Sequence, residues 1–169
     1  YFLLVLEVLL LIFLKQTHMK PQKRHKALQP LSREHHHGLL LSWKIRSGFN
    51  KNVEPKRIKK YADWFFKTHL IPHFDMEETH IFSILESDNE LIKKALAEHR
   101  RLKRLFSETD VNTSTLGKIE EELEQHIRFE ERVLFPEIQK VATEEQMNLI
   151  EKIHQPESFE DNLEDEFWK

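Results

Sequence analysis

The sequence contains no cysteine, and this absence excludes several kinds of site at once. A chain without thiols has no disulfide framework, no thiolate metal site, no iron–sulfur cluster and no cysteine nucleophile. Any metal ion that binds here therefore depends on nitrogen and oxygen ligands.

Glycine and proline are scarce as well, with three and six copies in 169 residues. Sandwiches and barrels need many tight turns, and these two residues supply most of them. At 33%, charged residues are also too frequent for a membrane bundle. A single all-α domain is the class that composition favours. Histidine is the residue in excess, with eleven copies.

One long apolar run is present, at residues 1–14, and Glu7 interrupts it. It is too short to span a bilayer comfortably, and it lacks the basic start and small-residue cleavage site of a secretory signal. We expect residues 1–18 to lie outside the functional domain, with Met19 as a natural start; the alternative is a membrane anchor. Without such an anchor, the expected location is the cytoplasm.

Charge is unevenly distributed, since residues 19–60 are strongly basic and residues 61–169 are acidic. The basic side chains alternate with apolar positions at helical spacing, without the aromatic or glycine-rich motifs that bind nucleic acids. The sequence therefore indicates a solvated helix face and no nucleic-acid partner.

From Leu31 onward, apolar residues recur at intervals of three and four, which predicts helices and no strand. Start and stop signals favour helices over 31–49, 55–86, 87–108 and 114–141, and a short fifth helix over 143–154. Ser87 with Glu90 and Thr143 with Gln146 resemble capping boxes, and Pro72 is expected to kink the second helix.

Short connectors between these helices predict an up-down-up-down antiparallel four-helix bundle over residues 31–154. Residues 19–30 are a polar lead-in. Residues 155–169 form an acidic tail in which Phe159, Leu163 and Phe167 are spaced by four, so this tail is expected to dock on the bundle.

An internal repeat divides the bundle into two similar hairpins. The second and fourth helices contain HFDMEETHIF (73–82) and HIRFEERVLF (126–135), which align without gaps. A shorter repeat relates Glu34-His35 in the first helix to Glu98-His99 in the third. Self-similarity of this kind predicts that the two hairpins face each other.

The repeat places a histidine and a glutamate four residues apart in two helices. His73 with Glu77 and His126 with Glu130 lie within stripes that face the core. A buried imidazole or carboxylate costs several kcal/mol unless it is paired or coordinated. One such pair alone is a common surface pattern, but two pairs in register predict a metal site.

Each of the other two helices adds a histidine. His99 lies in the apolar stripe of the third helix, and His35 precedes an apolar face that contains Leu39 and Trp43. Imidazoles and carboxylates without thiolates suit iron, manganese or zinc, and bundle interiors can hold a carboxylate-bridged metal pair. Each metal-binding histidine also needs an acceptor for its second ring nitrogen, and Glu34, Glu98 or backbone carbonyls are candidates.

These motifs resemble the hemerythrin-like, HHE cation-binding domain over residues 28–154. The resemblance implies a non-haem di-iron centre in which His35, His73, His99 and His126 are terminal ligands. It further implies that Glu77 and Glu130 bridge two iron ions, together with an oxide or hydroxide. Oxygen-carrying members have a second histidine one turn after the ligand in the third helix, where this chain has Lys103.

A fifth histidine ligand could come from elsewhere in the chain, and the candidates are His80, His69 and His36. His80 is preferred, because the repeat equates it with Val133, an expected core position. Water could fill the position instead. His18, His25 and His154 are expected to be ordinary surface residues, and an apolar shell of Phe66, Phe129, Leu102 and Trp43 is expected around the metals.

Three functions remain open at this point. The first is a di-iron protein that binds oxygen, nitric oxide or iron for sensing, storage or stress defence. The second is a di-iron oxidoreductase, such as a peroxidase or nitric oxide reductase, and the third is a bundle with a purely structural metal. The sequence favours the first, a binding protein rather than an enzyme, because it contains no flavin, haem or redox-cysteine motif.

Overall fold

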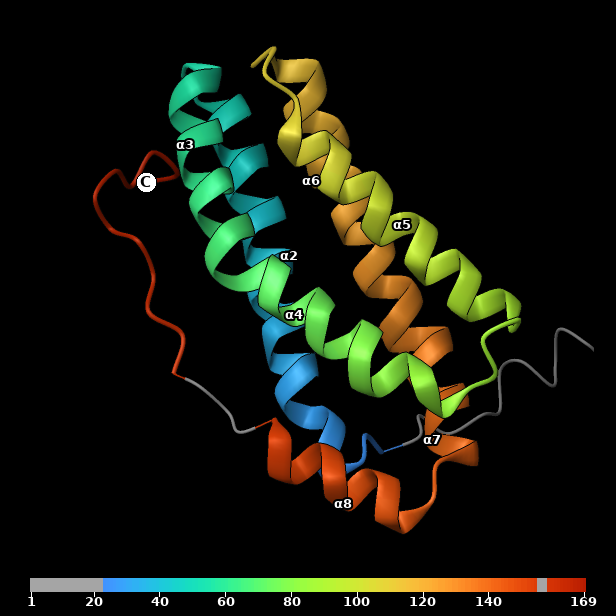
Figure 1. Ribbon diagram of the computed structural model, residues 1–169. Coiled ribbons are helices and arrows are strands. Elements are labelled where there is room, and N and C mark those ends of the chain that lie inside the picture. Colours follow the sequence, from blue (N-terminus) through green and yellow to red (C-terminus); the bar gives the residue numbers. More distant parts are fainter. Residues whose placement is uncertain (1–22, 155–157) are drawn as a thin grey trace, which may run out of the picture.

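The computed structural model describes residues 23–154 and 158–169, and Figure 1 shows its helices. The expectations for residues 1–22, including His18, lie outside this part of the chain. Most described residues are helical and none forms a strand, as the sequence predicted. Within the described segments, no helix is both long and apolar enough to cross a membrane.

Four helical rods run up and down the molecule in turn, as predicted (Figure 1). The first is α2 (Gln29–Asn50), preceded by the 3₁₀ turn η1 (Lys26–Leu28). The third is α5 (Glu90–Ser107), and the short α8 (Glu144–Ile153) packs across one end of the bundle. The second rod consists of α3 (Pro55–Phe65), η2 (Phe66–Leu70), α4 (Ile71–Met76), η3 (Glu77–Ile81) and η4 (Phe82–Ile84). The fourth consists of α6 (Thr113–Phe129), η5 (Glu130–Leu134) and α7 (Phe135–Val141).

Helix starts follow local capping chemistry. Thr143 and Gln146 form the predicted capping box of α8. The predicted box at Ser87 is wrong, because Asn89 caps α5 and accepts a hydrogen bond from the backbone N–H of Leu91. Asparagine is among the strongest N-cap residues, and here it lies closer to the helix than the serine does.

The second and fourth rods contain π-helical turns. Pro72 and Pro136 follow η2 and η5 at the start of the next α-helical segment. Proline has no N–H for the usual bond to the carbonyl four residues earlier, which favours a local change of helical pitch. A third π turn, η3, begins at Glu77, at the repeat position that corresponds to Glu130 in η5.

The apolar core forms two clusters. One includes Leu41, Phe65 and Leu123, and the other includes Leu31, Ile81 and Leu134. Along each rod the predicted metal ligands fall between members of these two clusters. Packing on both sides therefore fixes the helices at the height where their polar residues meet.

The C-terminal segment 158–169 docks on α2 and α3, but without forming a helix. Phe167 and Trp168 are buried, and the Lys44 ammonium lies 3.6 Å from the Trp168 ring centroid. Leu163 is 61% exposed, so the predicted four-residue stripe is wrong. A non-helical backbone does not bring residues spaced by four onto one face.

Candidate metal centre

Six polar side chains from all four rods converge between the two apolar clusters. All are at most 5% exposed, a rare burial for such groups. They come from α2 (His35), from the second rod (His73 and Glu77), from α5 (His99) and from the fourth rod (His126 and Glu130). The structure therefore brings together the six residues that the sequence singled out.

Their donor atoms form two groups that share two carboxylates. His35, His73, Glu77 and Glu130 make one group, and Glu77, His99, His126 and Glu130 make the other. Within each group one donor atom per residue lies within 4.8 Å of the others.

Several buried atoms of these groups make no well-formed hydrogen bond and meet one another only in ion pairs, such as His35 Nε2 with Glu130 Oε2 at 3.1 Å. They are Nε2 of His35 and of His73, and both carboxylate oxygens of Glu77 and of Glu130. Buried polar atoms without well-formed hydrogen bonds are costly, and here they face one another across a common centre. Imidazole nitrogens and carboxylate oxygens in this arrangement fit a pair of first-row transition metal ions.

Four further glutamates orient the histidines, because each accepts a hydrogen bond from the Nδ1–H of one ring. The pairs are Glu34 with His73 (2.6 Å), Glu78 with His99 (2.8 Å), Glu98 with His126 (3.0 Å) and Glu131 with His35 (2.7 Å). Every pair joins neighbouring rods, so the four bonds close a ring around the bundle. A donating Nδ1–H leaves the lone pair on Nε2, which is the atom that faces the centre.

Each of these four glutamates, which we call the outer glutamates, is in turn held by a basic side chain. These are His154 for Glu34 (2.8 Å), Lys103 for Glu78 (3.2 Å), Lys94 for Glu98, and Arg24 for Glu131 (2.9 Å). Lys103 therefore has a partner of its own at the position where oxygen carriers have a histidine. Its ammonium supports the carboxylate that orients His99.

The electrostatics of the centre hold protons on the imidazoles. Burial acts to lower the pKa of His73, but the charge of Glu77 and the bond to Glu34 raise it to about 9. Burial likewise opposes protonation of His35, yet bonds to the neighbouring glutamates raise its pKa well above the ordinary value. Burial also raises the pKa of Glu34, but hydrogen bonds from His154 and His73 bring it down to about 2. A metal cation could replace these protons.

Three phenylalanines cover the histidines. Phe74 stacks on His99 with ring centroids 3.9 Å apart, Phe82 lies 5.5 Å from His99, and Phe135 stacks on His35 at 5.3 Å. All three belong to the repeated segments 73–82 and 126–135.

Of the shell that the sequence predicted, only Leu102 is fully buried. Trp43 is 47% exposed, and Phe66 stacks on Phe106. Phe129 is half-buried and lies 4.3 Å below the Lys94 ammonium. The Trp43 prediction is wrong because the buried face of α2 follows His35, Gly38, Ser42 and Ile45, and Trp43 lies off that face.

The prediction that His80 lies in the metal pocket is wrong, because His80 is exposed. The π-helical turn η3 explains this. It holds about one residue more than an α-helical turn, so the core position moves from the third residue after Glu77 to the fourth, Ile81, which is fully buried. Val133 is 42% exposed and Leu134 is buried for the same reason in η5.

Neither of the other two candidates for a fifth ligand, His69 and His36, is in a donor group, and His154 differs from the expectation for it. His36 is exposed, whereas its neighbour His37 stacks on Phe159 with centroids 4.0 Å apart. His69 contacts Phe159 as well, at 4.9 Å, and is in neither donor group. His154 is a half-buried partner of Glu34 rather than an ordinary surface residue.

Glu34 and Glu98 were among the acceptors that the sequence indicated, whereas the roles of Glu78, Glu131 and His154 were not expected. The signal for the two glutamates was present, because each is the second residue of a repeated Glu-Glu pair. No local pattern marks His154, which reaches Glu34 only because α8 folds back across the end of the bundle.

Comparison with protein families matches the hemerythrin HHE cation binding domain over residues 23–138. Neither the curated proteins nor the solved structures gave a match. The matched range includes all six convergent side chains and the four outer glutamates, and it covers well over half of the chain. The chain belongs to the hemerythrin HHE cation binding domain family.

Proposed function

We propose that this protein is a non-haem di-iron protein that binds oxygen or nitric oxide, or handles iron itself, in sensing, storage or stress defence. The observation that carries the proposal is the sharing of Glu77 and Glu130 by two donor groups. A carboxylate common to both groups suits a metal pair better than a single ion. When bound, the two irons would supply redox chemistry and an open coordination position for a diatomic molecule.

In this proposal the chain itself performs three tasks. His35 and His73 with one metal, and His99 and His126 with the other, offer Nε2 lone pairs that the outer glutamates fix in place. Glu77 and Glu130 would supply negative charge to both metals. Phe74 and Phe135 keep bulk water away from the imidazoles, which strengthens electrostatic interactions inside the site.

Metal analysis tests this proposal. Protein purified after expression in iron-supplemented medium is expected to contain two irons per chain and to absorb in the near ultraviolet and visible. Less than half an equivalent of metal would contradict the di-metal assignment, and a colourless protein filled with zinc would favour a structural metal.

Glu130→Ala tests whether Glu130 serves both metal ions. Because Glu130 is shared by both donor groups, its loss is expected to abolish binding of both metals and to lower the melting temperature. Glu137→Ala, on the same rod but in neither donor group and with a side chain that is 44% exposed, is the control and is expected to keep both metals.

A further inference from the structure

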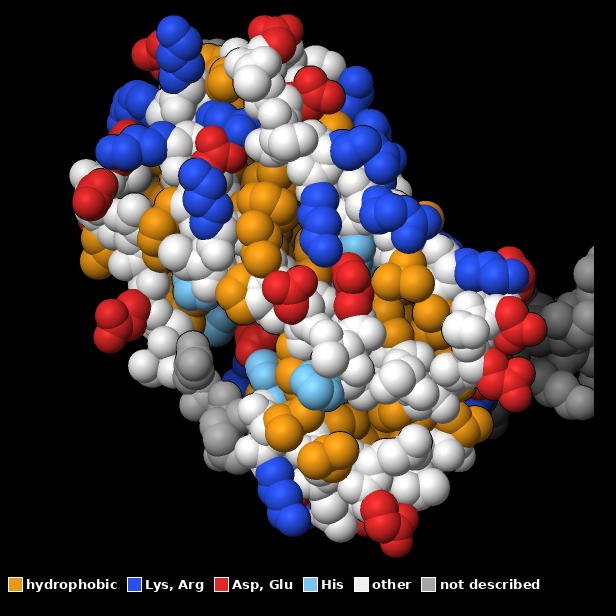
Figure 2. All heavy atoms as spheres, viewed as in Figure 1, with side chains coloured by type: hydrophobic (Ala, Val, Ile, Leu, Met, Phe, Trp, Pro, Cys, Tyr) orange, Lys and Arg blue, Asp and Glu red, His pale blue; other side chains and the backbone are white. Residues whose placement is uncertain are grey.

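A cavity of about 330 Å³ opens beside the metal centre, between α2 and the second rod. In Figure 2, histidine side chains border a hollow on this face of the molecule. At its inner end the cavity is lined by His35, His73 and His126 of the metal centre. Phe159 of the C-terminal segment also lines it. The cavity thus gives access to the centre.

Its size exceeds what a diatomic molecule requires. One water molecule occupies about 30 Å³ of liquid, and a cavity of about 150 Å³ already holds benzene. Pockets for organic ligands begin at about 300 Å³. The space beside this centre is therefore that of an organic ligand.

Aromatic rings supply much of the wall. Phe65 and Phe74 come from the second rod, and Phe159 lies against Phe65 at 6.2 Å and against His37 at 4.0 Å between centroids. Leu123 and Ile127 of α6 complete an apolar side. Flat aromatic walls favour a planar apolar body through offset or edge contacts.

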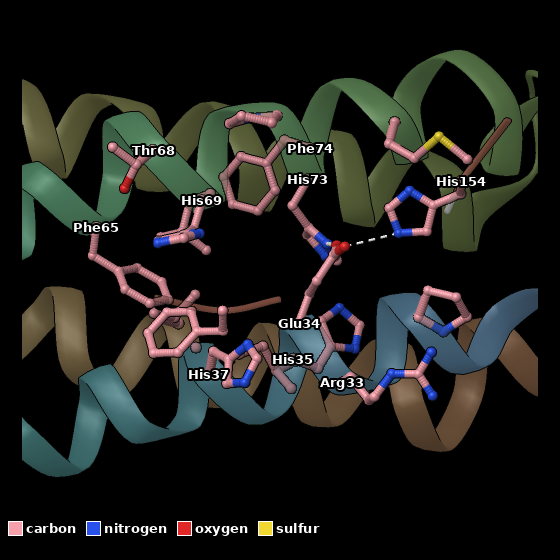
Figure 3. A pocket seen from close by; sticks show the side chains of 18 of the residues that line it. Arg33, Glu34, His35, His37, Phe65, Thr68, His69, His73, Phe74 and His154 are labelled. Carbon is pink, nitrogen blue, oxygen red and sulfur yellow. Dashed lines mark hydrogen bonds and ion pairs between the residues drawn. The ribbon is translucent and has the colours of Figure 1, made fainter. Parts of the chain in front are cut away.

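The described polar residues of the wall offer hydrogen-bond donors and almost no negative charge. Among the described residues of the lining, Glu34 is the single carboxylate, and His73 and His154 already hold both of its oxygens. Arg33, His37 and His69 lie in the lining as well. Figure 3 shows His37 and His69 facing the same space from opposite helical segments. Such a wall favours an anion over a cation.

We propose that this cavity binds a small aromatic carboxylate. Its ring lies among Phe65, Phe74 and Phe159, and its carboxylate faces His37 and His69, which lie beside Phe159. The inference rests on the proposed function in one respect, since two metal ions bring more positive charge than Glu77 and Glu130 neutralise, and an anionic ligand offsets the excess.

Calorimetric titration of the full-length, metal-loaded protein tests the ligand class with three probes. Benzoate carries both the ring and the charge, acetate carries only the charge, and benzyl alcohol carries only the ring. We expect one benzoate per chain, bound at least about tenfold more tightly than either of the other probes.

Two matched pairs of variants test the location. Phe159→Ala and His37→Ala are expected to weaken benzoate binding by about tenfold. Leu163→Ala, in the same C-terminal segment, and His36→Ala, one residue from His37, are expected to leave it unchanged. Metal content is measured for every variant and is expected to be equal, since none of these residues is in a donor group.

Three results would overturn the inference: no benzoate binding by metal-loaded protein, equal affinity for benzyl alcohol and benzoate, or equal benzoate affinity in all four variants. Failure of the proposed function is distinguishable, because it appears as low metal content. Benzoate binding to metal-poor protein with the same dependence on Phe159 and His37 would then support the cavity assignment on its own.

Discussion

At the scale of single residues, the centre depends on which neighbour holds each imidazole. Glu77, Glu130 and the four histidines of the donor groups supply donor atoms. The outer glutamates decide which ring nitrogen of each histidine carries the proton. Glu131 shows this clearly, because it binds His35 while Arg24 and Ser32 hold its carboxylate in position. A residue outside both donor groups thus controls a proposed ligand.

Glu131→Gln tests the influence of Glu131 on His35. The amide still accepts a hydrogen bond, but without the negative charge that makes His35 a stronger ligand. We expect metal affinity to fall by about 10- to 100-fold while the fold is retained. Competition with a chelator measures the affinity, and Glu121→Gln at an exposed position of α6 is the control. Equal affinities in the two variants would contradict the role assigned to Glu131.

His80→Leu tests the opposite case. Because the π turn directs His80 to solvent, its replacement is expected to leave metal content and absorption spectrum unchanged. The free energy of unfolding should change by no more than about 0.5 kcal/mol. Thermal unfolding and the spectrum of the iron-loaded protein are the measurements. A shifted spectrum would contradict this prediction, because it would show that His80 affects the metal site.

At the scale of elements, close approach between segments decides which substitutions the bundle accepts. Gly48 lies where α2 meets α3 and the C-terminal segment. A Cβ at this position would lie 2.7 Å from Ile58 Cδ1 and 3.1 Å from Phe167 Cδ2. A Cβ at Gly117 in α6 would meet no atom of another element within 4 Å. The same residue type thus has a packing role in one helix and none in the other.

This difference predicts opposite effects of one substitution. Gly117→Ala is expected to raise the free energy of unfolding by about 0.5–1 kcal/mol, because alanine favours the helix. Gly48→Ala is expected to lower it by about 1–3 kcal/mol, because Ile58 and Phe167 must shift. Chemical denaturation of both variants provides the measurement. Stabilisation by Gly48→Ala would show that Ile58 and Phe167 pack loosely against α2.

At the scale of the whole molecule, a network of charged side chains with a buried centre joins the four rods and α8. In the absence of metal, the raised pKa of His73 means that its imidazolium stabilises the folded state. Its folded pKa of about 9 exceeds the usual 6.5. The contribution is therefore complete below pH 6.5 and is lost as the pH rises through about 9.

The metal-free protein is accordingly expected to melt at a lower temperature at about pH 10 than at about pH 6.5. In metal-loaded protein the imidazoles are held in their neutral form, so this dependence on pH should largely disappear. Thermal unfolding of both forms across that range is the measurement. If the melting temperatures of both forms depend on pH in the same way, the dependence does not arise from the metal centre.

Much of this protein is determined by local sequence. The helical period, the Thr143 capping box and the spacing of His73 with Glu77 and of His126 with Glu130 follow from rules that act within one or two turns. The internal repeat further predicted that the two hairpins face each other. For these reasons the bundle and the six convergent residues could be predicted without coordinates.

Tertiary structure decided the rest, because it depends on backbone pitch and on contacts between distant segments. The π turns rotated His80 out of the core and Ile81 into it, which an α-helical period does not reveal. Docking of α8 made His154 a partner of Glu34, and docking of the C-terminal segment placed Phe159 beside His37. Side chains so far apart in sequence meet only when packing has fixed the helices that carry them.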